Sequence, residues 1–179
     1  MKRPVIACDV FGEAAQLAFG AQLGHALGTR SGVLYLHGDL GTGKTTLVRG
    51  LLRARGCRTA VRSPTYTLIE PYEDLEPPIA HLDLYRLGDP EELDYLGLRD
   101  LLERRCLMIV EWPERGRGVL PAADLEIELE HADDARRLSL RAAAEWTSVL
   151  EKLSVAGVPG VRWRLTAAKD PRTHGEGDG

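Results

Sequence analysis

The residues Gly38-Asp39-Leu40-Gly41-Thr42-Gly43-Lys44-Thr45 match the pattern G-x-x-x-x-G-K-[ST] at every fixed position. Glycines let such a loop curl so that successive backbone N–H groups face phosphate oxygens, and the helix that follows adds the positive end of its dipole. In this pattern the lysine bridges the β- and γ-phosphates, and the hydroxyl that follows it ligates Mg²⁺. The predicted nucleotide-binding residues are Gly38, Gly41, Thr42, Gly43, Lys44, Thr45 and Thr46.

The sequence around this loop indicates strands and helices in alternation. The run GVLYLH (32–37) is typical of a buried strand, and TTLVRGLLRAR (45–55) gathers its large apolar residues on one helical face. The run CLMIV (106–110) suits a strand covered on both faces. The segments DLEIELE (124–130) and RRLSLRA (136–142) alternate apolar and polar residues, so each should cover the core on one face only. We therefore predict an α/β fold of the P-loop NTPase type, with a mostly parallel central sheet and helices on both faces.

The remaining segments complete one domain. Helical spacing predicts a helix over 14–27, and strand-forming residues predict strands over 63–73 and 79–87. The order Asp-Pro-Glu-Glu at 89–92 is typical of a helix start, and we expect that helix to reach about residue 104. Residues 143–153 form a last predicted helix. We expect a single P-loop ATPase domain over 1–152 and a C-terminal extension over 153–179 with a disordered tip.

Composition narrows the classes of function. The chain of 179 residues has 23 Lys and Arg against 27 Asp and Glu, a net charge of −4, which disfavours direct binding of nucleic acid. Three widely spaced cysteines and the lack of a long apolar run predict a cytoplasmic protein with reduced thiols and no membrane segment. The chain contains no Asn, so the guanine-reading N-K-x-D motif of a GTP switch is absent.

Two carboxylates are candidates for the chemistry beside the loop. Glu111 follows the apolar run at 106–110 and suits the acidic Mg²⁺ ligand at the end of a neighbouring strand. Asp83, at the end of IAHLD, competes for that role, and either residue could hold the metal while the other orients the attacking water. Thr65 lies in a segment that can meet the γ-phosphate in P-loop switch proteins, although alternating Thr is equally typical of an edge strand. Trp112 is placed either beside the nucleotide or in the core.

Four segments, in this order along the chain, point to a family more specifically than the glycine-rich loop does alone. GDLGTGKTTLVRG, SPTYTLIEPY, HLDLYRLGDPEELDYLGLRD and CLMIVEWPERG together resemble the TsaE family of small ATPases in bacterial tRNA threonylcarbamoyladenosine biosynthesis. The resemblance covers about residues 9–150.

The resemblance implies a function and a set of partners. In that family the ATPase works with TsaB and TsaD, and TsaD transfers threonylcarbamoyl to adenosine 37 of tRNAs that read ANN codons. The resemblance implies that ATP and Mg²⁺ bind here, that Thr45 and Glu111 hold the metal, and that Lys44 and Asp83 act in hydrolysis. It places Thr65 in the switch-like segment and Trp112 beside the nucleotide. Contact with tRNA would be mainly indirect, through the partner proteins.

The sequence also departs from the family pattern and leaves a second function open. Gln16 stands where the family often has Thr, and Asp133-Asp134-Ala135-Arg136 stands where it often has a Gly-Arg element. The alternative is a P-loop small-molecule kinase, since the loop serves phosphoryl transfer to a bound acceptor equally well. Against the kinase, Arg86 is the only cation between Arg62 and Arg99, so the sequence has no Arg-rich lid there.

Overall fold

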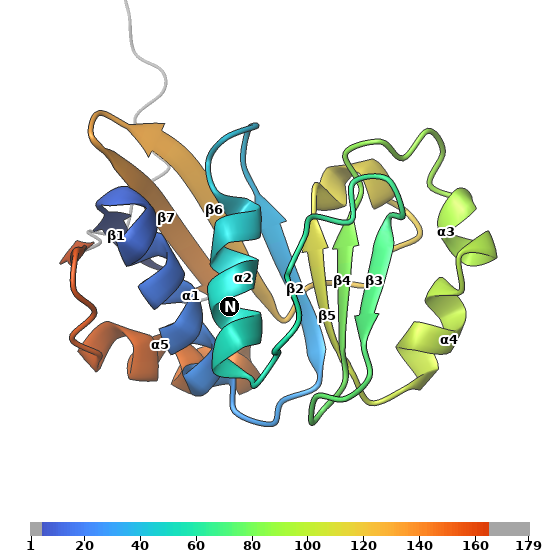
Figure 1. Ribbon diagram of the computed structural model, residues 1–179, viewed down its shortest axis with the longest axis horizontal. Coiled ribbons are helices and arrows are strands. Elements are labelled where there is room, and N and C mark those ends of the chain that lie inside the picture. Colours follow the sequence, from blue (N-terminus) through green and yellow to red (C-terminus); the bar gives the residue numbers. More distant parts are fainter. Residues whose placement is uncertain (1–4, 165–179) are drawn as a thin grey trace, which may run out of the picture.

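The computed structural model describes residues 5–164 and contains one large sheet in that range. The strand order is β3-β4-β5-β2-β6-β7-β1-β8, shown in Figure 1. The strands are β1 (Val5–Val10), β2 (Gly32–His37), β3 (Ile69–Tyr72), β4 (Ile79–Asp83), β5 (Leu107–Glu111), β6 (Leu125–Ala132), β7 (Ala135–Ala142) and β8 (Val161–Arg164). The helices are α1 (Gly12–Leu27), α2 (Lys44–Ala54), α3 (Glu92–Tyr95), α4 (Leu98–Glu103) and α5 (Thr147–Val155), with 3₁₀ turns at Pro113–Gly116 and Ala144–Trp146.

The sheet is mixed, so the prediction of a mostly parallel sheet is wrong. The strands β4, β5, β2 and β6 run parallel, but the pairs β3–β4, β6–β7, β7–β1 and β1–β8 are antiparallel. For the pairs β3–β4 and β6–β7 the physical reason is the length of the connections. Two residues, Asp133 and Asp134, join β6 to β7, and six residues join β3 to β4. Connections this short make hairpins, because a parallel pair needs a crossover of a dozen or more residues.

The core lies on both faces of the sheet. On one face Leu47 and Leu51 of α2 belong to the same apolar cluster as Ile109 of β5, together with residues of α1 and α5. On the other face Leu93 of α3 and Leu98 of α4 join a second cluster with alternate residues of β2, β4 and β5. The α/β class with helices against both faces therefore holds.

The helices α1 and α2 approach each other closely because glycines meet across their interface. A Cβ at Gly20 would lie 2.1 Å from the Leu47 carbonyl oxygen, and one at Gly50 would lie 2.1 Å from the Leu17 carbonyl oxygen. Any larger side chain at either position would push the helices apart. This contact carries α1 up to the glycine-rich loop of residues 38–45, the predicted phosphate-binding loop, because α2 begins at Lys44 inside that loop.

In the structure, two elements have bounds that differ from those predicted from the sequence. The helix expected from residue 90 to 104 is broken into α3 and α4 at Gly97, whose φ of 86° is left-handed. The first residues of the expected C-terminal extension form α5's end and β8, which pairs with β1 at the sheet edge. The predicted disordered tip lies beyond residue 164, outside the described residues.

Candidate nucleotide-binding site

The candidate site lies where three neighbouring parallel strands end. The loop that starts at Gly38 follows β2, Glu111 ends β5 and Asp83 ends β4. Asp83 and Glu111 are direct register partners, and Glu111 also pairs with Leu36 of β2. Ligands in α/β proteins bind at the carboxyl ends of parallel strands, and the topology brings the predicted residues to that edge.

The predicted phosphate-binding loop, over residues 38–45, is held by its own lysine. Lys44 is 4% exposed, and its Nζ donates hydrogen bonds to the carbonyl oxygens of Gly38 and Asp39 at 2.6 and 2.9 Å. Gly43, with φ of 89°, adopts a left-handed conformation at the start of α2. Burial lowers the pKa of Lys44, and the nearby carboxylates, Glu111 foremost, oppose that shift.

Glu111 links the loop to the interior of the sheet. The Thr45 hydroxyl donates to its two carboxylate oxygens at 3.0 and 3.1 Å, and His81 Nε2 lies 2.8 Å from Oε1. His81 is 0% exposed and Glu111 is 2% exposed. Within residues 5–164 His81 Nδ1 has no hydrogen-bond partner, so a proton on Nε2 fits this geometry best. That proton makes His81 the donor and Glu111 the acceptor.

Asp83 organises a different part of the site. Its Oδ2 accepts hydrogen bonds from the hydroxyls of Ser63 and Thr65, the latter at 2.9 Å, and its Oδ1 accepts the backbone N–H of Tyr85 at 3.1 Å. The segment with Ser63 and Thr65 forms turns and loop rather than the predicted strand, which begins only at Ile69. Asp83 therefore ties the segment expected to act as a switch to the end of β4.

Trp112 closes one wall of the site. It has a left-handed backbone, with φ of 58°, and its ring centroid lies 4.3 Å from Lys44 Nζ, a distance that gives a cation–π contact. The Tyr85 ring packs against it with centroids 5.0 Å apart. The Trp112 ring therefore covers the lysine from one side.

These residues surround a cleft of about 360 Å³. Of the predicted site residues, nine line it: Gly41, Gly43, Lys44, Thr45, Thr46, Thr65, Asp83, Glu111 and Trp112. Thr42 is buried behind the loop, where its hydroxyl donates to the Asp39 carbonyl oxygen at 2.9 Å, and Gly38 contributes its carbonyl to Lys44. The structure thus gathers the candidate residues from four separate segments around one space.

The donor set fits a hard cation that binds partly through a phosphate ligand. Thr45 supplies a hydroxyl and Glu111 a carboxylate, and oxygen donors of this kind suit Mg²⁺. Between residues 5 and 164 no group of three or more His, Cys, Asp or Glu side chains converges as a metal site. A cation here would take its other ligands from phosphate and water, as Mg²⁺ does in nucleotide sites.

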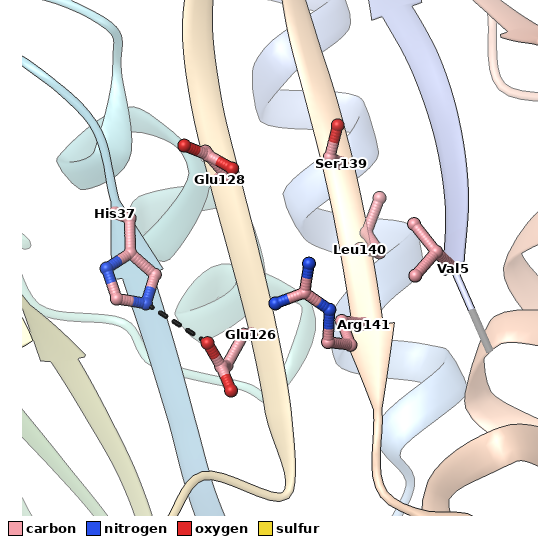
Figure 2. Close-up of a pocket in the computed structure, with 7 residues that line it drawn as sticks. All are labelled: Val5, His37, Glu126, Glu128, Ser139, Leu140 and Arg141. Atoms are coloured by element: carbon pink, nitrogen blue, oxygen red, sulfur yellow. Dashed lines mark ion pairs between the residues drawn. The ribbon is translucent and has the colours of Figure 1, made fainter. Parts of the chain in front are cut away.

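A second hollow, of about 250 Å³, lies over β6 and β7 (Figure 2). Polar side chains of β6 and β7 line it, and His37 Nε2 lies 3.4 Å from Glu126 Oε2. Glu126 stands directly opposite Arg141 in the β6–β7 register, an opposite-charge cross-strand pair. This hollow has the charge pattern of a solvated sheet face, so the cleft at the loop is the candidate site.

One known protein family matches most of this chain. The family model of the threonylcarbamoyl adenosine biosynthesis protein TsaE matches residues 12–139. The chain belongs to the TsaE family. The matched range contains the phosphate-binding loop and both acidic residues of the cleft.

Individual TsaE relatives agree with the family match. A Haemophilus influenzae protein named "tRNA threonylcarbamoyladenosine biosynthesis protein TsaE" is 49% identical over 108 residues, which cover 60% of this chain and 68% of the relative. A Bacillus subtilis protein of the same name is 37% identical over 136 residues, 75% of this chain and 85% of the relative. The crystal structure of Bacillus subtilis YdiB superposes with a TM-score of 0.71 at 28% identity, over 86% of this chain and 97% of that one.

Several residues of this TsaE-family site were not predicted from the sequence. Tyr85 lines the cleft, His81 contacts Glu111, and Gln16 donates from α1 to the loop carbonyls of Thr42 and Gly43. One signal was present for His81, because strand positions two apart share a face and His81 precedes Asp83 by two. Gln16 stood out in the sequence only as a departure from the TsaE pattern.

No helix within residues 5–164 is long and apolar enough to cross a membrane.

Proposed function

We propose that this chain binds ATP with Mg²⁺ and hydrolyses it in support of tRNA threonylcarbamoyladenosine biosynthesis. The observation that carries the proposal is the contact of the Thr45 hydroxyl with Glu111 at the mouth of a complete phosphate-binding loop. Family membership and the names of the H. influenzae and B. subtilis relatives support the pathway.

The loop and Lys44 bind the phosphates. The loop N–H groups and the N-terminus of α2 favour negative charge, and Lys44 already lies under the loop. When ATP binds, the Lys44 ammonium exchanges the carbonyls of Gly38 and Asp39 for phosphate oxygens. Trp112 keeps that ammonium in place through its ring.

Glu111 and Asp83 have different roles in the proposed function. Thr45 and Glu111 would hold Mg²⁺, which when bound neutralises the charge that develops on the phosphate oxygens. The direct contact between these two side chains favours Glu111 over Asp83 as the metal ligand. Asp83 positions the segment of Ser63 and Thr65 and would orient the attacking water.

The charges around the cleft support activity that depends on partners. Among the described residues that line the cleft, Lys44 is the only cation. Rapid hydrolysis in P-loop enzymes usually requires a further cation, an arginine supplied in the same chain or by a partner. We therefore propose that TsaB and TsaD homologues complete the site, that tRNA contacts are mainly theirs, and that the complex works in the cytoplasm.

The experiment is an ATPase assay of the purified chain with Mg²⁺, alone and with the TsaB and TsaD homologues of the same organism. We expect slow hydrolysis by the chain alone and much faster hydrolysis when both partners are present. The matched control is Lys44→Ala, which should remain at background in both conditions. Rapid phosphorylation of a metabolite by the isolated chain would contradict the proposal and favour a small-molecule kinase.

A further inference from the structure

Gln16 is a buried polar residue beneath the phosphate-binding loop. It belongs to α1, it is 5% exposed, and its Nε2 donates hydrogen bonds to the carbonyl oxygens of Thr42 and Gly43, both at 2.9 Å. Two carbonyl acceptors on one atom determine which end of the amide faces the loop, because only the NH₂ group can donate to both. Gln16 therefore contacts the loop from α1 and is not among the residues that line the cleft.

The geometry of the peptide bond gives this contact a consequence on the cleft side. In a trans peptide the C=O and the next N–H point in opposite directions. The Thr42 carbonyl shares a peptide plane with the Gly43 N–H, and the Gly43 carbonyl shares one with the Lys44 N–H. When Gln16 holds the two carbonyls on the protein side, the N–H groups of Gly43 and Lys44 are turned away from it.

The packing around Gln16 shows that it occupies a defined position. A Cβ at Gly43 would lie 2.3 Å from Gln16 Nε2, so the side chain fills the space that glycine leaves. Gly43 has φ of 89°, and glycine lacks the steric restraint that would otherwise keep its peptide planes in one orientation. A flexible residue at the centre of the loop is thus restrained by hydrogen bonds from another helix.

We propose that Gln16 is a positioning residue of the nucleotide site, which pre-orients the amides of Gly43 and Lys44 toward the phosphates of the ligand. The proposal rests on the proposed function, because it assumes that a phosphorylated ligand binds at the loop. Preorganisation of this kind strengthens binding by removing an ordering cost that the ligand would otherwise bear. The ligand group concerned is the phosphate chain, and neither the base nor the ribose enters the argument.

The test measures binding of a fluorescent ADP analogue to the full chain with Mg²⁺, with pyrophosphate as a competitor. Gln16→Met keeps the length of the side chain and removes both donors. Gln16→Glu keeps its shape and replaces the donors with an acceptor that repels the carbonyls. The matched control is Gln22→Met, because Gln22 is the other glutamine of the chain, lies on the same helix and is half-buried.

We expect Gln16→Met to weaken binding of the ADP analogue and of pyrophosphate by a similar factor, roughly tenfold for the loss of hydrogen bonds worth about 1.4 kcal/mol. Gln16→Glu should weaken both further, and Gln22→Met should stay within about twofold of wild type. Thermal denaturation of each variant checks that it is folded, and if Gln16→Met is not, the isosteric Glu variant decides.

Two results would overturn the role of Gln16. One is unchanged affinity in folded Gln16 variants, and the other is weaker binding of the ADP analogue with unchanged binding of pyrophosphate. In both cases the wild-type chain binds the nucleotide, so the proposed function stands. Failure of the wild-type chain to bind either ligand would instead overturn the proposed function.

Discussion

Replacing His81 with leucine should weaken Mg²⁺ binding while leaving the fold nearly as stable. His81 Nε2 lies 2.8 Å from a Glu111 oxygen in a fully buried position, and a hydrogen bond to a charged group contributes about 1.5–3 kcal/mol. Leucine removes that donor, so the carboxylate keeps only the Thr45 hydroxyl among its hydrogen bonds in residues 5–164. Loss of a group that orients a metal ligand typically costs about 10–100-fold in metal affinity.

The free energy of unfolding should change little, because His81→Leu also removes a cost that the histidine imposes on the fold. His81 Nδ1 is buried without a partner in the described part of the chain, and an unsatisfied buried nitrogen costs about 1–3 kcal/mol. Leucine removes this cost together with the useful hydrogen bond, so the two changes in the free energy of unfolding oppose each other. The predicted result is a large change in Mg²⁺ affinity with a small change in stability.

The assay titrates Mg²⁺ into the chain with a fixed amount of a fluorescent ADP analogue and compares midpoints with urea denaturation curves. The control is His25→Leu, because His25 is exposed on α1. His81→Gln should recover part of the affinity, since it retains an N–H donor on a side chain of similar reach. A midpoint within twofold of wild type in a folded His81→Leu variant would show that His81 does not support Mg²⁺ binding.

Three further predictions concern packing, pH and catalysis. Gly50→Ala should cost about 1–3 kcal/mol of stability by overpacking the α1–α2 contact, measured by urea unfolding, whereas Gly157→Ala should be near neutral because its Cβ would meet nothing within 4 Å. Burial alone would raise the pKa of Asp9, but hydrogen bonds and charge from two arginines outweigh this effect and lower that pKa. Asp9 therefore stabilises the fold above about pH 4, and this stabilisation is lost as pH falls through the lowered pKa. Asp9→Asn should therefore flatten the acid side of a stability-versus-pH curve, and an unchanged slope would contradict this. Glu111→Ala should retain much of the nucleotide binding and lose Mg²⁺-dependent hydrolysis; unchanged hydrolysis would transfer the metal role to Asp83.

The sequence predicted the parts of the fold that depend on local residues. The loop from Gly38 to Thr45 carries its own pattern, and the apolar runs at β2 and β5 are long enough to identify as buried strands. Glu111 and Asp83 were placed correctly at strand ends, because an acid after an apolar run marks the edge of a parallel sheet. These features need no knowledge of distant contacts.

The unpredicted parts depend on pairing between distant segments. The strand β1 was missed because its partners, β7 and β8, lie more than 120 residues away in the chain. The hairpin of β6 and β7 had a visible signal, two alternating segments with a short polar turn between them, and that signal argues against a mostly parallel sheet. Gln16 donates hydrogen bonds to carbonyl groups that lie 26 and 27 residues further along the chain, and no local sequence pattern predicts a contact at that separation.

We propose that nucleotide hydrolysis at the loop drives tRNA threonylcarbamoyladenosine formation. The most direct measurement is the amount of this nucleoside at adenosine 37 of tRNA, determined by mass spectrometry after repeated turnover. The reaction contains tRNA, the TsaB and TsaD homologues, ATP and an independent supply of the threonylcarbamoyl donor. It is run once with the wild-type chain and once with Lys44→Ala. We predict sustained modification with wild type and little modification with Lys44→Ala. Equal modification with both chains would contradict the account.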